Sequence, residues 1–401
     1  MKTGERISLE QAYALHRALI KPLATEEVSL ERAQGRTVCR DILASMDQPP
    51  FPRSPYDGYA LIAADAGEAG RDCPADLLVV GKSRAGVPCQ TPVRRGQAVR
   101  IMTGAVIPEG ADCVVPQEKT DMGKDRVLVY TSLKPYDNYC FAGEDFKTGE
   151  LLIPRDRKLG ALSVSVAAQS GYAVLPVYPA LKAAVLSTGD ELAEAGGALR
   201  AGQIFDSNSL WLKGRLNELG VTLTGARKVR DEGREIAGNL AELLEEADLV
   251  VTTGGISVGE YDLLPQALGY LGAKILYHGV DIKPGMPAMT ALCGGKPVVC
   301  LSGNPFAAIV DFELLVRHVL FTLSRDPAFL LRRETARAGN SFSKRSPVRR
   351  FLQGRASGGD IQILYQGNGL LRDLDGYQYL VEVPAGCPGV EAGAQVTVYR
   401  V

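Results

Sequence analysis

Hydrophobic and polar positions follow two patterns along the chain, and the first occupies its middle, from about Pro179 to Leu323. There an apolar run, a turn of small residues and an amphipathic stretch succeed one another several times. The runs and their turns are Leu181–Leu186 with Ser187-Thr188-Gly189, Asp248–Thr252 with Thr253-Gly254-Gly255, and Pro297–Leu301 with Ser302-Gly303-Asn304. Short β-branched runs that end in glycine turns and lead into helices are typical of a parallel α/β sheet. We therefore predict one doubly wound domain of roughly 150 residues.

Apolar residues at helical spacing indicate where the helices lie. The stripes are Leu212, Leu216 and Leu219; Ile236, Leu240, Leu243 and Leu244; and Leu264, Ala267, Leu268 and Leu271. Gly220 suits the position that follows the end of the first of these helices. The longest helix is expected from Phe306 onward, and another near the N-terminus with Ser8 as its cap.

The second pattern, on both flanks, is rich in glycine and proline, with short alternating runs and no long helical period. Residues 47–145 and 327–401 are therefore expected to form small β-rich domains, the second of them barrel-like. The remaining predicted parts are an N-terminal helix in 1–22 that packs with the linking or sheet region, a linking domain from 23–46 and 146–176, and the α/β domain over 177–326. The predicted fold class is multidomain α/β plus β.

Composition limits the possible partners. The 401 residues carry 45 basic and 46 acidic side chains, for a formal net charge of −1. Nucleic-acid and membrane-surface binders usually have a basic excess, so neither partner is expected. No uncharged apolar run approaches the roughly 20 residues that span a bilayer, and the N-terminus lacks a signal-peptide core. Eight scattered cysteines without a Cys-x-x-Cys pair fit reduced thiols, so we expect a cytoplasmic protein.

The glycine turns are where a ligand is expected, because ligands of open parallel sheets bind beyond the carboxyl ends of the strands. In the turn from Thr253 to Gly259, small residues let successive N–H groups point at one anion, and the following helix start adds partial positive charge. A phosphate or a nucleotide is the natural ligand. Taken alone, such a turn is more often a plain strand-to-helix connection.

Acidic residues accompany these turns, namely Asp190, Glu191, Asp231, Glu260 and Asp262. Carboxylates beside a phosphate site suggest Mg²⁺, which bridges protein and phosphate oxygens. Asp231 and Asp262 each precede a helical stripe and would also serve as N-caps, although capping does not explain the whole group.

Two further motifs could each have a functional role or a simpler explanation. Lys283-Pro284-Gly285 is a rigid loop that could bring Lys283 to an oxyanion, although a lone surface lysine is the simpler interpretation. Gly255-x-Ser257-x-Gly259 matches the nucleophile elbow of hydrolases. That chemistry needs a suitably oriented histidine, and neither His278 nor His318 has a fitting context, so we discount it.

Nine short segments of the chain, taken in sequence order, match the motifs of one protein family. They are Arg53–Ala60, Arg100–Ala105, Gly110-Ala111-Asp112 with Gln117-Glu118, Gly143-Glu144-Asp145, Ser187–Leu192, Asp206-Ser207-Asn208, Thr253–Glu260, Lys283-Pro284-Gly285 and Ser302–Pro305, with Arg350 beyond them. With this series the chain resembles the MoeA family of molybdopterin molybdenumtransferases, which is also represented by gephyrin. The resemblance implies an elongated four-domain protomer and a homodimer with a shared active cleft, in which the 47–145 domain of one protomer faces the sheet domain of the other.

The resemblance implies a reaction and assigns residues to it. The reaction is Mg²⁺-assisted cleavage of adenylylated molybdopterin, with release of AMP as molybdate joins the dithiolene. An upstream adenylyltransferase would deliver the substrate in a transient contact. Asp57, Thr103 and Asp145 would line the cleft from the β domain, and Glu191, Asp231 and Asp262 would form its acidic floor and hold Mg²⁺. The adenylate would bind at Thr253, Gly254, Gly255, Ser257 and Gly259, near Asn304 and Pro305, and Lys283 and Arg350 would hold the oxyanion.

Four single positions depart from the family pattern, and the tail Asp373-Leu374-Asp375-Gly376-Tyr377 also departs from the usual Ala-Asn-Gly pattern. Met286 stands where a second lysine is usual after Lys-Pro-Gly, Ala307 where serine is common, Asn368 within the Gly-Ser-Gly-like turn, and Tyr56 where methionine is usual. A thioether cannot replace an ammonium group as a donor. Three functions remain open: the family reaction with Arg350 and Asn368 compensating, a diverged paralogue for another oxyanion or pterin form, and a gephyrin-like dimeric scaffold without catalysis. The retained acids disfavour the scaffold.

Overall fold

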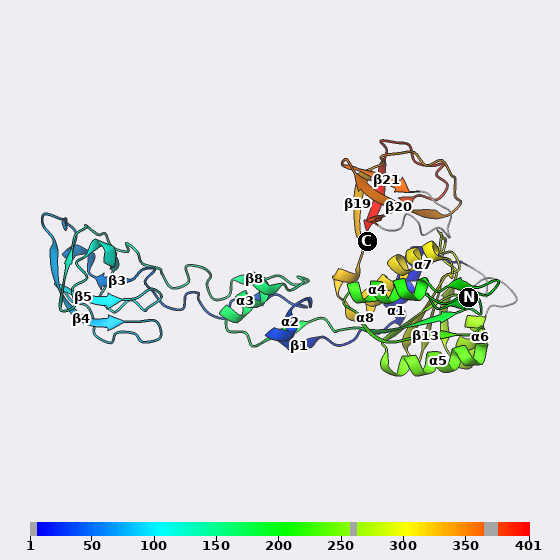
Figure 1. Ribbon diagram of the computed structural model, residues 1–401, viewed down its shortest axis with the longest axis horizontal. Coiled ribbons are helices and arrows are strands. Elements are labelled where there is room, and N and C mark those ends of the chain that lie inside the picture. Colours follow the sequence, from blue (N-terminus) through cyan, green and yellow to red (C-terminus); the bar gives the residue numbers. More distant parts are fainter. Residues whose placement is uncertain (1–5, 257–262, 365–375) are drawn as a thin grey trace. The chain divides into compact units, whose positions relative to one another are not determined.

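The computed structural model describes residues 6–256, 263–364 and 376–401 of the chain (Figure 1). The chain forms two compact units. The first unit comprises Met1–Glu27, Gly35–Cys39 and Pro176–Val401, and the second comprises Val28–Gln34 and Arg40–Leu175. Strands β1 (Glu26–Ser29) and β9 (Val174–Val177) lie where the chain passes from one unit to the other.

The first unit is built on a six-stranded sheet of order β13-β10-β14-β18-β17-β15. Its strands are β10 (Lys182–Thr188), β13 (Thr222–Val229), β14 (Leu249–Thr253), β15 (Lys274–His278), β17 (Met289–Cys293) and β18 (Lys296–Leu301). The first four in this order are parallel, which confirms the predicted α/β sheet. β17 pairs antiparallel with β18 and with β15, so the prediction of a wholly parallel sheet was wrong at this side. Gly294 and Gly295, both with positive φ, close a two-residue hairpin there, and a hairpin can only join antiparallel strands.

Helices cover both faces of this sheet (Figure 1). They are α1 (Leu9–Leu19), α4 (Asn208–Glu218), α5 (Gly233–Glu246), α6 (Leu263–Tyr270), α7 (Pro305–Asp311) and α8 (Arg317–Ser324). Alternate strand residues point to opposite faces, so Ala183 and Val185 pack with α1, α4, α7 and α8, while Ala184 and Leu186 pack with α5 and α6. This double burial explains why the strands read as continuous apolar runs.

Side chains cap the starts of α1 and α5. Ser8 caps α1 in a capping box with Gln11, as predicted. Glu232, and not Asp231, caps α5 by accepting the N–H groups of Arg234 and Glu235. The prediction of Asp231 as the cap was wrong because α5 begins at Gly233, which places the N-cap position one residue later, at Glu232. The Asp231 carboxylate is therefore left for other contacts.

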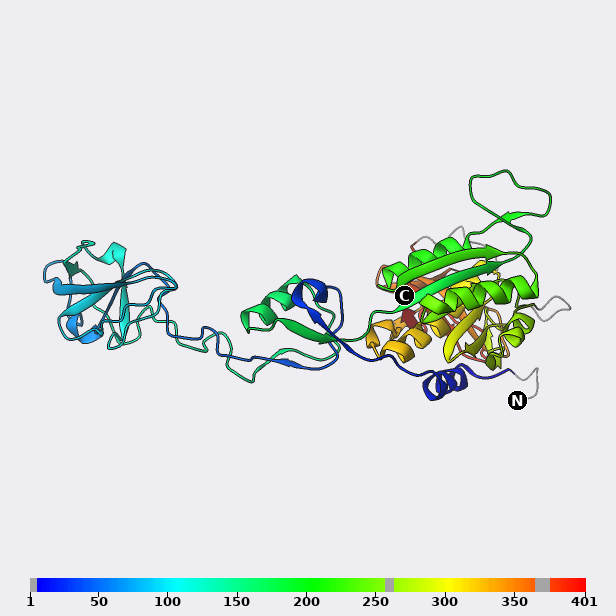
Figure 2. The same cartoon turned by 90° about the horizontal axis from the view of Figure 1, so that it is seen from below.

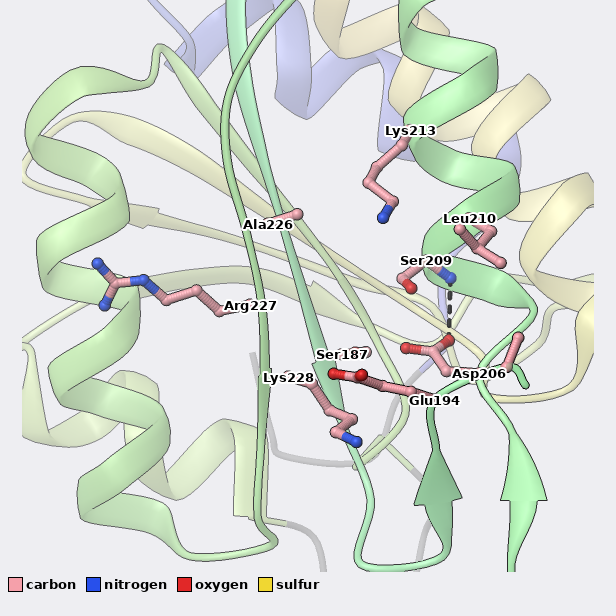
Figure 3. Close-up of a pocket in the computed structure, with 10 residues that line it drawn as sticks. Ser187, Glu194, Asp206, Ser209, Leu210, Lys213, Ala226, Arg227 and Lys228 are labelled. Carbon is pink, nitrogen blue, oxygen red and sulfur yellow. Dashed lines mark hydrogen bonds between the residues drawn. The ribbon is translucent and has the colours of Figure 1, made fainter. Parts of the chain in front are cut away.

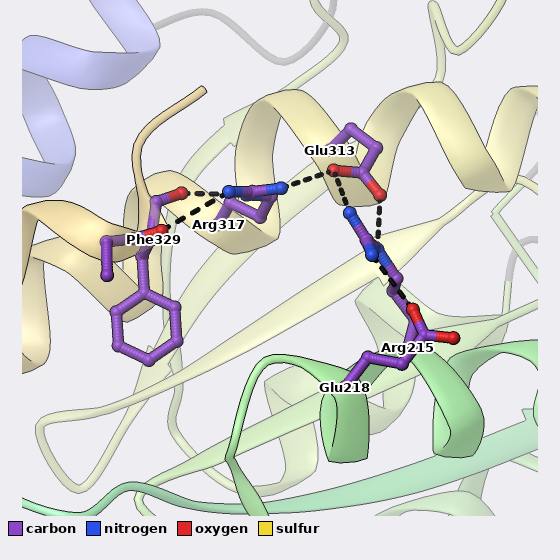
Figure 4. A network of polar contacts seen from close by, with 6 residues as sticks. Arg215, Glu218, Glu313, Arg317 and Phe329 are labelled. Carbon is purple, nitrogen blue, oxygen red and sulfur yellow. Dashed lines mark hydrogen bonds and ion pairs between the residues drawn. The ribbon is translucent and has the colours of Figure 1, made fainter. Parts of the chain in front are cut away.

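The last long helix is interrupted by a π-helical segment, Phe312–Val316, between α7 and α8. Such segments often mark functional or strained positions in helices. Here it places the buried Glu313 between two guanidinium groups, those of Arg215 at 2.7 Å and Arg317 at 3.0 Å (Figure 4). Arg317 also donates to the carbonyl of Phe329.

A second sheet completes this unit, in the order β16-β20-β22-β23-β19 with β21 paired to β20. Its strands are β16 (Ile282–Lys283), β19 (Arg332–Arg337), β20 (Arg349–Ser357), β21 (Asp360–Leu364), β22 (Tyr379–Val383) and β23 (Gln395–Arg400). β16 belongs in sequence to the α/β region but pairs with β20, so the two regions share a sheet.

The second unit contains a five-stranded sheet of order β6-β3-β5-β4-β7. Its strands are β3 (Gly58–Leu61), β4 (Ala75–Ser83), β5 (Gln97–Ile101), β6 (Cys113–Pro116) and β7 (Arg126–Val129). Tyr59, Leu61, Val115 and Val127 contribute to its apolar core. The same unit includes α2 (Leu30–Ala33), α3 (Ala161–Gln169) and a two-stranded sheet of β2 (Ile42–Leu43) and β8 (Leu151–Ile153).

Candidate functional site

The three predicted glycine turns converge at the carboxyl ends of β10, β14 and β18. The Asn208 amide donates to Thr253 Oγ1 at 2.9 Å and to the carbonyl of Gly303 at 2.8 Å, and Thr253 Oγ1 donates to the carbonyl of Ser302. One asparagine at the start of α4 therefore ties two turns together. This convergence was predicted from the sequence, whereas the tying role of Asn208 was not.

Gly254 lies where no side chain fits. Its φ is +91°, and a Cβ there would approach the carbonyl oxygen of Thr188 to 2.3 Å. The close approach leaves a small pocket of about 70 Å³ at the strand ends. It is lined by Thr188, Glu191, Leu192, Ile204, Phe205, Asp206, Ser207, Asn208, Thr253, Gly254, Gly303 and Pro305. The pocket thus brings together Glu191, Thr253, Gly254 and Pro305 of the predicted site residues.

Several polar groups at this edge have no hydrogen-bond partner within the described chain. They are the buried hydroxyls of Ser187, Thr188 and Thr252, and the side-chain oxygen of Asn304. Unsatisfied buried polar groups cost free energy and are rare in folded proteins. Their concentration beside the pocket is what a site made to bind a polar ligand would show.

Acidic residues flank the same edge. Partial burial raises the pKa of Asp231, and repulsion from Glu191 and Asp190 adds to this, whereas the N–H of Asp190 acts in the opposite direction. The three carboxylates therefore lie within electrostatic reach of one another. Among the described residues, no group of three or more His, Cys, Asp or Glu side chains is already arranged as a metal site.

A larger neighbouring pocket, of about 340 Å³, opens between α4, β13 and the two short strands β11 (Leu192–Ala193) and β12 (Ile204–Phe205) (Figure 3). It shares Asp206 with the small pocket. Figure 3 shows the ammonium group of Lys213 directed into this space, whereas Arg227 extends away and pairs with Glu242 on α5. The acidic and basic lining gives room for a polar ligand larger than the small pocket alone can hold.

Lys283 and Arg350 are brought together by strand pairing. They occupy opposed positions on the parallel strands β16 and β20. Arg350 is buried, its guanidinium stacks on the ring of Phe342 at 5.4 Å, and its Nε has no hydrogen-bond partner in the described chain. Two cations held side by side, one of them buried, form a site suited to an oxyanion.

Three of the four single residues that depart from the family pattern lie in the described chain, and of these Tyr56 is exposed. Met286 lies beside the N-terminal segment, where its sulfur accepts a hydrogen bond from Arg6 at 3.3 Å. Arg6 is also paired with Asp281, so a cation reaches this loop from outside the Lys-Pro-Gly motif. Ala307 is buried in α7.

Asp311 of α7 was expected from the sequence only as part of a core helix. It is fully buried, its Oδ2 accepts the N–H of Ser302 at 3.2 Å, and its Oδ1 lies against Gly285. Burial raises its pKa well above the ordinary value, and the N–H of Ser302 acts in the opposite direction. The sequence signal for this buried acid was a single acidic residue that directly follows the apolar run Phe306–Val310.

In the second unit, Asp57 and Thr103 form a pair. Both the N–H and the hydroxyl of Thr103 donate to Asp57 Oδ1 at 2.8 Å, and these two bonds lower the pKa of Asp57. Asp145 is exposed, and its N–H donates to the carbonyl of Gln48. The predicted residues Ser257, Gly259, Asp262 and Asn368 lie outside the described residues.

Comparison with known proteins assigns the chain to a protein family. Residues 7–171 match the MoeA N-terminal region (domain I and II), and residues 184–322 match a probable molybdopterin binding domain. A molybdopterin molybdenumtransferase of Bacillus subtilis is 33% identical over 385 residues, which cover 93% of this chain and 89% of that protein. The chain belongs to the molybdopterin molybdenumtransferase family. A Staphylococcus aureus protein of the same name is 31% identical over 380 residues, with 92% and 90% covered.

The structural comparison agrees with this family. A molybdopterin biosynthesis MoeA protein of Pyrococcus horikoshii has a TM-score of 0.85 at 29% identity, over 99% of both chains. Membership makes this protein a transferase of molybdenum cofactor biosynthesis, as the resemblance implied. In the described part of the chain, no helix has the length and apolar character that crossing a membrane requires.

Proposed function

We propose that this protein inserts molybdate into adenylylated molybdopterin in an Mg²⁺-dependent reaction that releases AMP. The observation that carries this proposal is the opposed pair of Lys283 and Arg350. The buried Nε of Arg350 has no hydrogen-bond partner in the described chain. An oxyanion accepts charge-assisted hydrogen bonds from both groups, which offsets the cost of placing two cations side by side.

The glycine turns support the second half of the proposal, which is adenylate binding. The pocket at Thr253, Gly254 and Pro305 places small residues and unpartnered hydroxyls at the carboxyl ends of parallel strands. Phosphate oxygens accept hydrogen bonds from such groups. The larger pocket beside it, with Lys213 directed inward, gives space for the rest of the substrate (Figure 3).

The acidic residues fit an Mg²⁺ ion. Carboxylate oxygens are the ligands that Mg²⁺ prefers, and Glu191 and Asp231 would hold it, with Asp262 added from the sequence. Partial burial contributes most to the raised pKa of Asp231, and repulsion from Glu191 and Asp190 adds to it; a divalent cation would relieve this repulsion. When bound, Mg²⁺ would neutralise and polarise the phosphoanhydride. The residues of the chain would orient the adenylate, keep the carboxylates together and position the oxyanion.

The active unit is proposed to be a homodimer with a shared cleft, to which Asp57, Thr103 and Asp145 contribute from the β domain. The family resemblance supports this arrangement. The two hydrogen bonds from Thr103, which lower the pKa of Asp57, support a functional role for that carboxylate. A transient contact with the upstream adenylyltransferase would supply the substrate.

The experiment is AMP release from adenylylated molybdopterin with Mg²⁺, with and without molybdate, for the wild-type chain, Arg350→Gln, Lys283→Gln and the control Lys274→Gln. Lys274 is an exposed lysine at the start of β15. We expect molybdate-dependent release in the wild type and the control, and a loss of the molybdate response in both site variants. Release in the wild type that ignores molybdate would instead favour a diverged paralogue acting on another oxyanion. No AMP release by the wild type, with or without molybdate, would reject the proposal.

A further inference from the structure

A pocket of about 670 Å³ lies on one face of the five-stranded sheet in the second unit. It is lined by Tyr59, Val79, Val80, Gly81, Lys82, Arg100, Met122, Gly123 and Lys124. Three of these side chains are cationic and none is acidic. Arg100 opens the Arg100–Ala105 motif, and the proposed function gives Arg100 itself no role.

Strand register explains why the charges meet. Tyr59 on β3 and Lys82 on β4 are both register partners of Arg100 on β5, which lies between them. Register partners on neighbouring strands share a face, so Lys82 and Arg100 point the same way from adjacent positions. Like charges in this relationship destabilise a sheet unless something lies between them.

The partners of Arg100 are neutral. Its guanidinium stacks over the ring of Tyr59 at 4.8 Å and donates through Nη2 to the side-chain oxygen of Gln117. Its Nη1 is buried without a hydrogen-bond partner in the described chain. The Tyr59 hydroxyl donates to the carbonyl of Gly123, so the tyrosine is fixed and offers Arg100 only its ring.

Among the described residues, no carboxylate forms an ion pair with Lys82, Arg100 or Lys124, although the charge of Arg100 contributes to the lowered pKa of Asp57. The described chain contains no ion pair or side-chain hydrogen bond for Lys82 or Lys124, and no ion pair for Arg100. Asp57 feels the charge of Arg100, but its two hydrogen bonds from Thr103 lower its pKa more than Arg100 does. Placing an arginine with a buried, unpartnered donor among two lysines is unfavourable unless an anion binds there.

We propose that this pocket, formed by Lys82, Arg100 and Lys124, binds a tetrahedral oxyanion such as a phosphate. The anion pairs with the guanidinium of Arg100 and accepts hydrogen bonds from the two ammonium groups. The oxyanion is either free or the phosphoryl group of a small molecule, since the pocket is larger than a phosphate and is otherwise lined by Val79, Val80 and Met122. This inference concerns the β domain alone and does not depend on the proposed reaction.

The test measures the chemical reactivity of each lysine separately in the full-length protein. Lys82 and Lys124 are acetylated with a limiting amine reagent at rising concentrations of inorganic phosphate or AMP, at constant ionic strength set with sodium chloride. Mass spectrometry then gives the extent of modification at each lysine. Lys134, exposed in the same unit but outside the pocket, is the internal reference. A site-specific readout separates this pocket from any anion bound in the first unit.

Saturable protection of Lys82 and Lys124, with Lys134 unchanged, supports the pocket. Arg100→Gln should raise the midpoint of protection by about tenfold, because it removes the buried charged donor. Lys124→Gln, a surface change that leaves the sheet intact, should raise the Lys82 midpoint if Arg100→Gln fails to fold. Tighter protection by AMP than by phosphate identifies a phosphorylated small molecule, and equal protection identifies a free oxyanion. Unprotected Lys82, or equal protection of Lys134, overturns the proposal.

Discussion

Gly285 lies directly against the buried carboxyl group of Asp311: a Cβ on Gly285 would stand 1.9 Å from Asp311 Oδ1. This contact joins the Lys283-Pro284-Gly285 loop to α7, and Asp311 Oδ2 in turn accepts the N–H of Ser302. One buried acid therefore contacts both the loop that carries Lys283 and the turn that precedes Asn304. Substitutions at either residue of the pair test these contacts.

Gly285→Ala should displace this loop. The residue has a φ of +98°, which costs a non-glycine residue roughly 1–2 kcal/mol, and the added methyl group also overlaps Asp311. Gly272→Ala is a matched control, since Gly272 has a φ of +62° but a Cβ added there would meet no heavy atom within 4 Å. Urea unfolding should show a larger loss for Gly285→Ala than for Gly272→Ala. Equal losses would mean that the loop accommodates the methyl group.

Asp311→Asn should remove a pH dependence of stability. The folded chain binds a proton at Asp311 that the unfolded chain releases above the ordinary pKa of 3.8, so the stability contribution is lost as pH rises from there through the raised folded pKa. Asparagine keeps an oxygen for the N–H of Ser302 and cannot ionise. The free energy of unfolding of the variant, measured by urea titration at several pH values, should fall less with rising pH than that of the wild type. Parallel curves would show that Asp311 is ionised when buried.

The sequence was sufficient for the α/β layers and insufficient for the contacts that complete the site. Alternation within Ala183–Leu186 buries both faces of β10, which the continuous apolar run already indicated. The antiparallel strand β17 was missed although Gly294-Gly295 is a readable hairpin signal, because the apolar run before it was not recognised as a strand.

Pairings between residues far apart in the sequence could not be predicted from local patterns. The register that sets Lys283 against Arg350 joins segments 67 positions apart, since 350 − 283 = 67, and no local pattern specifies it. The family resemblance placed both residues at an oxyanion, but only the strand pairing gives a physical reason for their proximity. Likewise the π-helical turn that positions Glu313 has no signal in the apolar spacing.

The buried ion network around Glu313 predicts an asymmetric response to mutation (Figure 4). Glu313→Ala leaves the buried guanidinium group of Arg317 and the partly buried one of Arg215 without their shared carboxylate, which should cost about 3–5 kcal/mol of unfolding free energy. Glu218→Ala removes a carboxylate that also contacts Arg215, but from an exposed position, and should cost less than about 1 kcal/mol. Urea unfolding of the two variants gives the comparison. Similar small losses would mean that the network is energetically neutral.

Two buried histidines predict sensitivity to acid. The rings of His16 on α1 and His318 on α8 lie with their Nδ1 atoms 3.1 Å apart, and His16 also contacts the hydroxyl of Tyr277. Burial lowers the pKa of His16 to about 3 and that of His318 to about 4, and their mutual repulsion adds to the effect on His16. The unfolded chain takes up protons near 6.5, so stability should be lost as pH falls from about 6.5 towards 4.

His16→Gln should flatten this loss, because an amide can still hydrogen-bond to Tyr277 but does not bind a proton in this range. His278→Gln removes the third histidine of the chain, outside the pair, and serves as the control. Thermal unfolding at about pH 8, 6.5 and 4.5, a range that brackets the ordinary histidine pKa, should show a smaller fall for His16→Gln than for wild type and control. The same fall in all three proteins would place the acid-sensitive groups elsewhere.

Thr103 offers the sharpest test of the β-domain residues, because the chain contains a second pair of the same geometry. Thr148 donates through its N–H at 2.8 Å and its hydroxyl at 2.7 Å to Asp47, as Thr103 does to Asp57, and both carboxyl groups have a lowered pKa for this reason. Thr103→Val and Thr148→Val each remove one hydroxyl bond at nearly constant volume. Their effects on stability should therefore be alike and small.

Their effects on catalysis should differ. Losing the hydroxyl raises the pKa of Asp57 towards its ordinary value and frees its side chain to rotate, so Thr103→Val should lower molybdate-dependent AMP release by about tenfold. The acid limb of its pH profile should move to higher pH, because a carboxylate with a raised pKa is protonated earlier as pH falls. Thr148→Val should leave both the rate and the profile unchanged. If both variants keep full activity, Asp57 is not oriented by Thr103 for the reaction, and its assignment to the cleft is wrong.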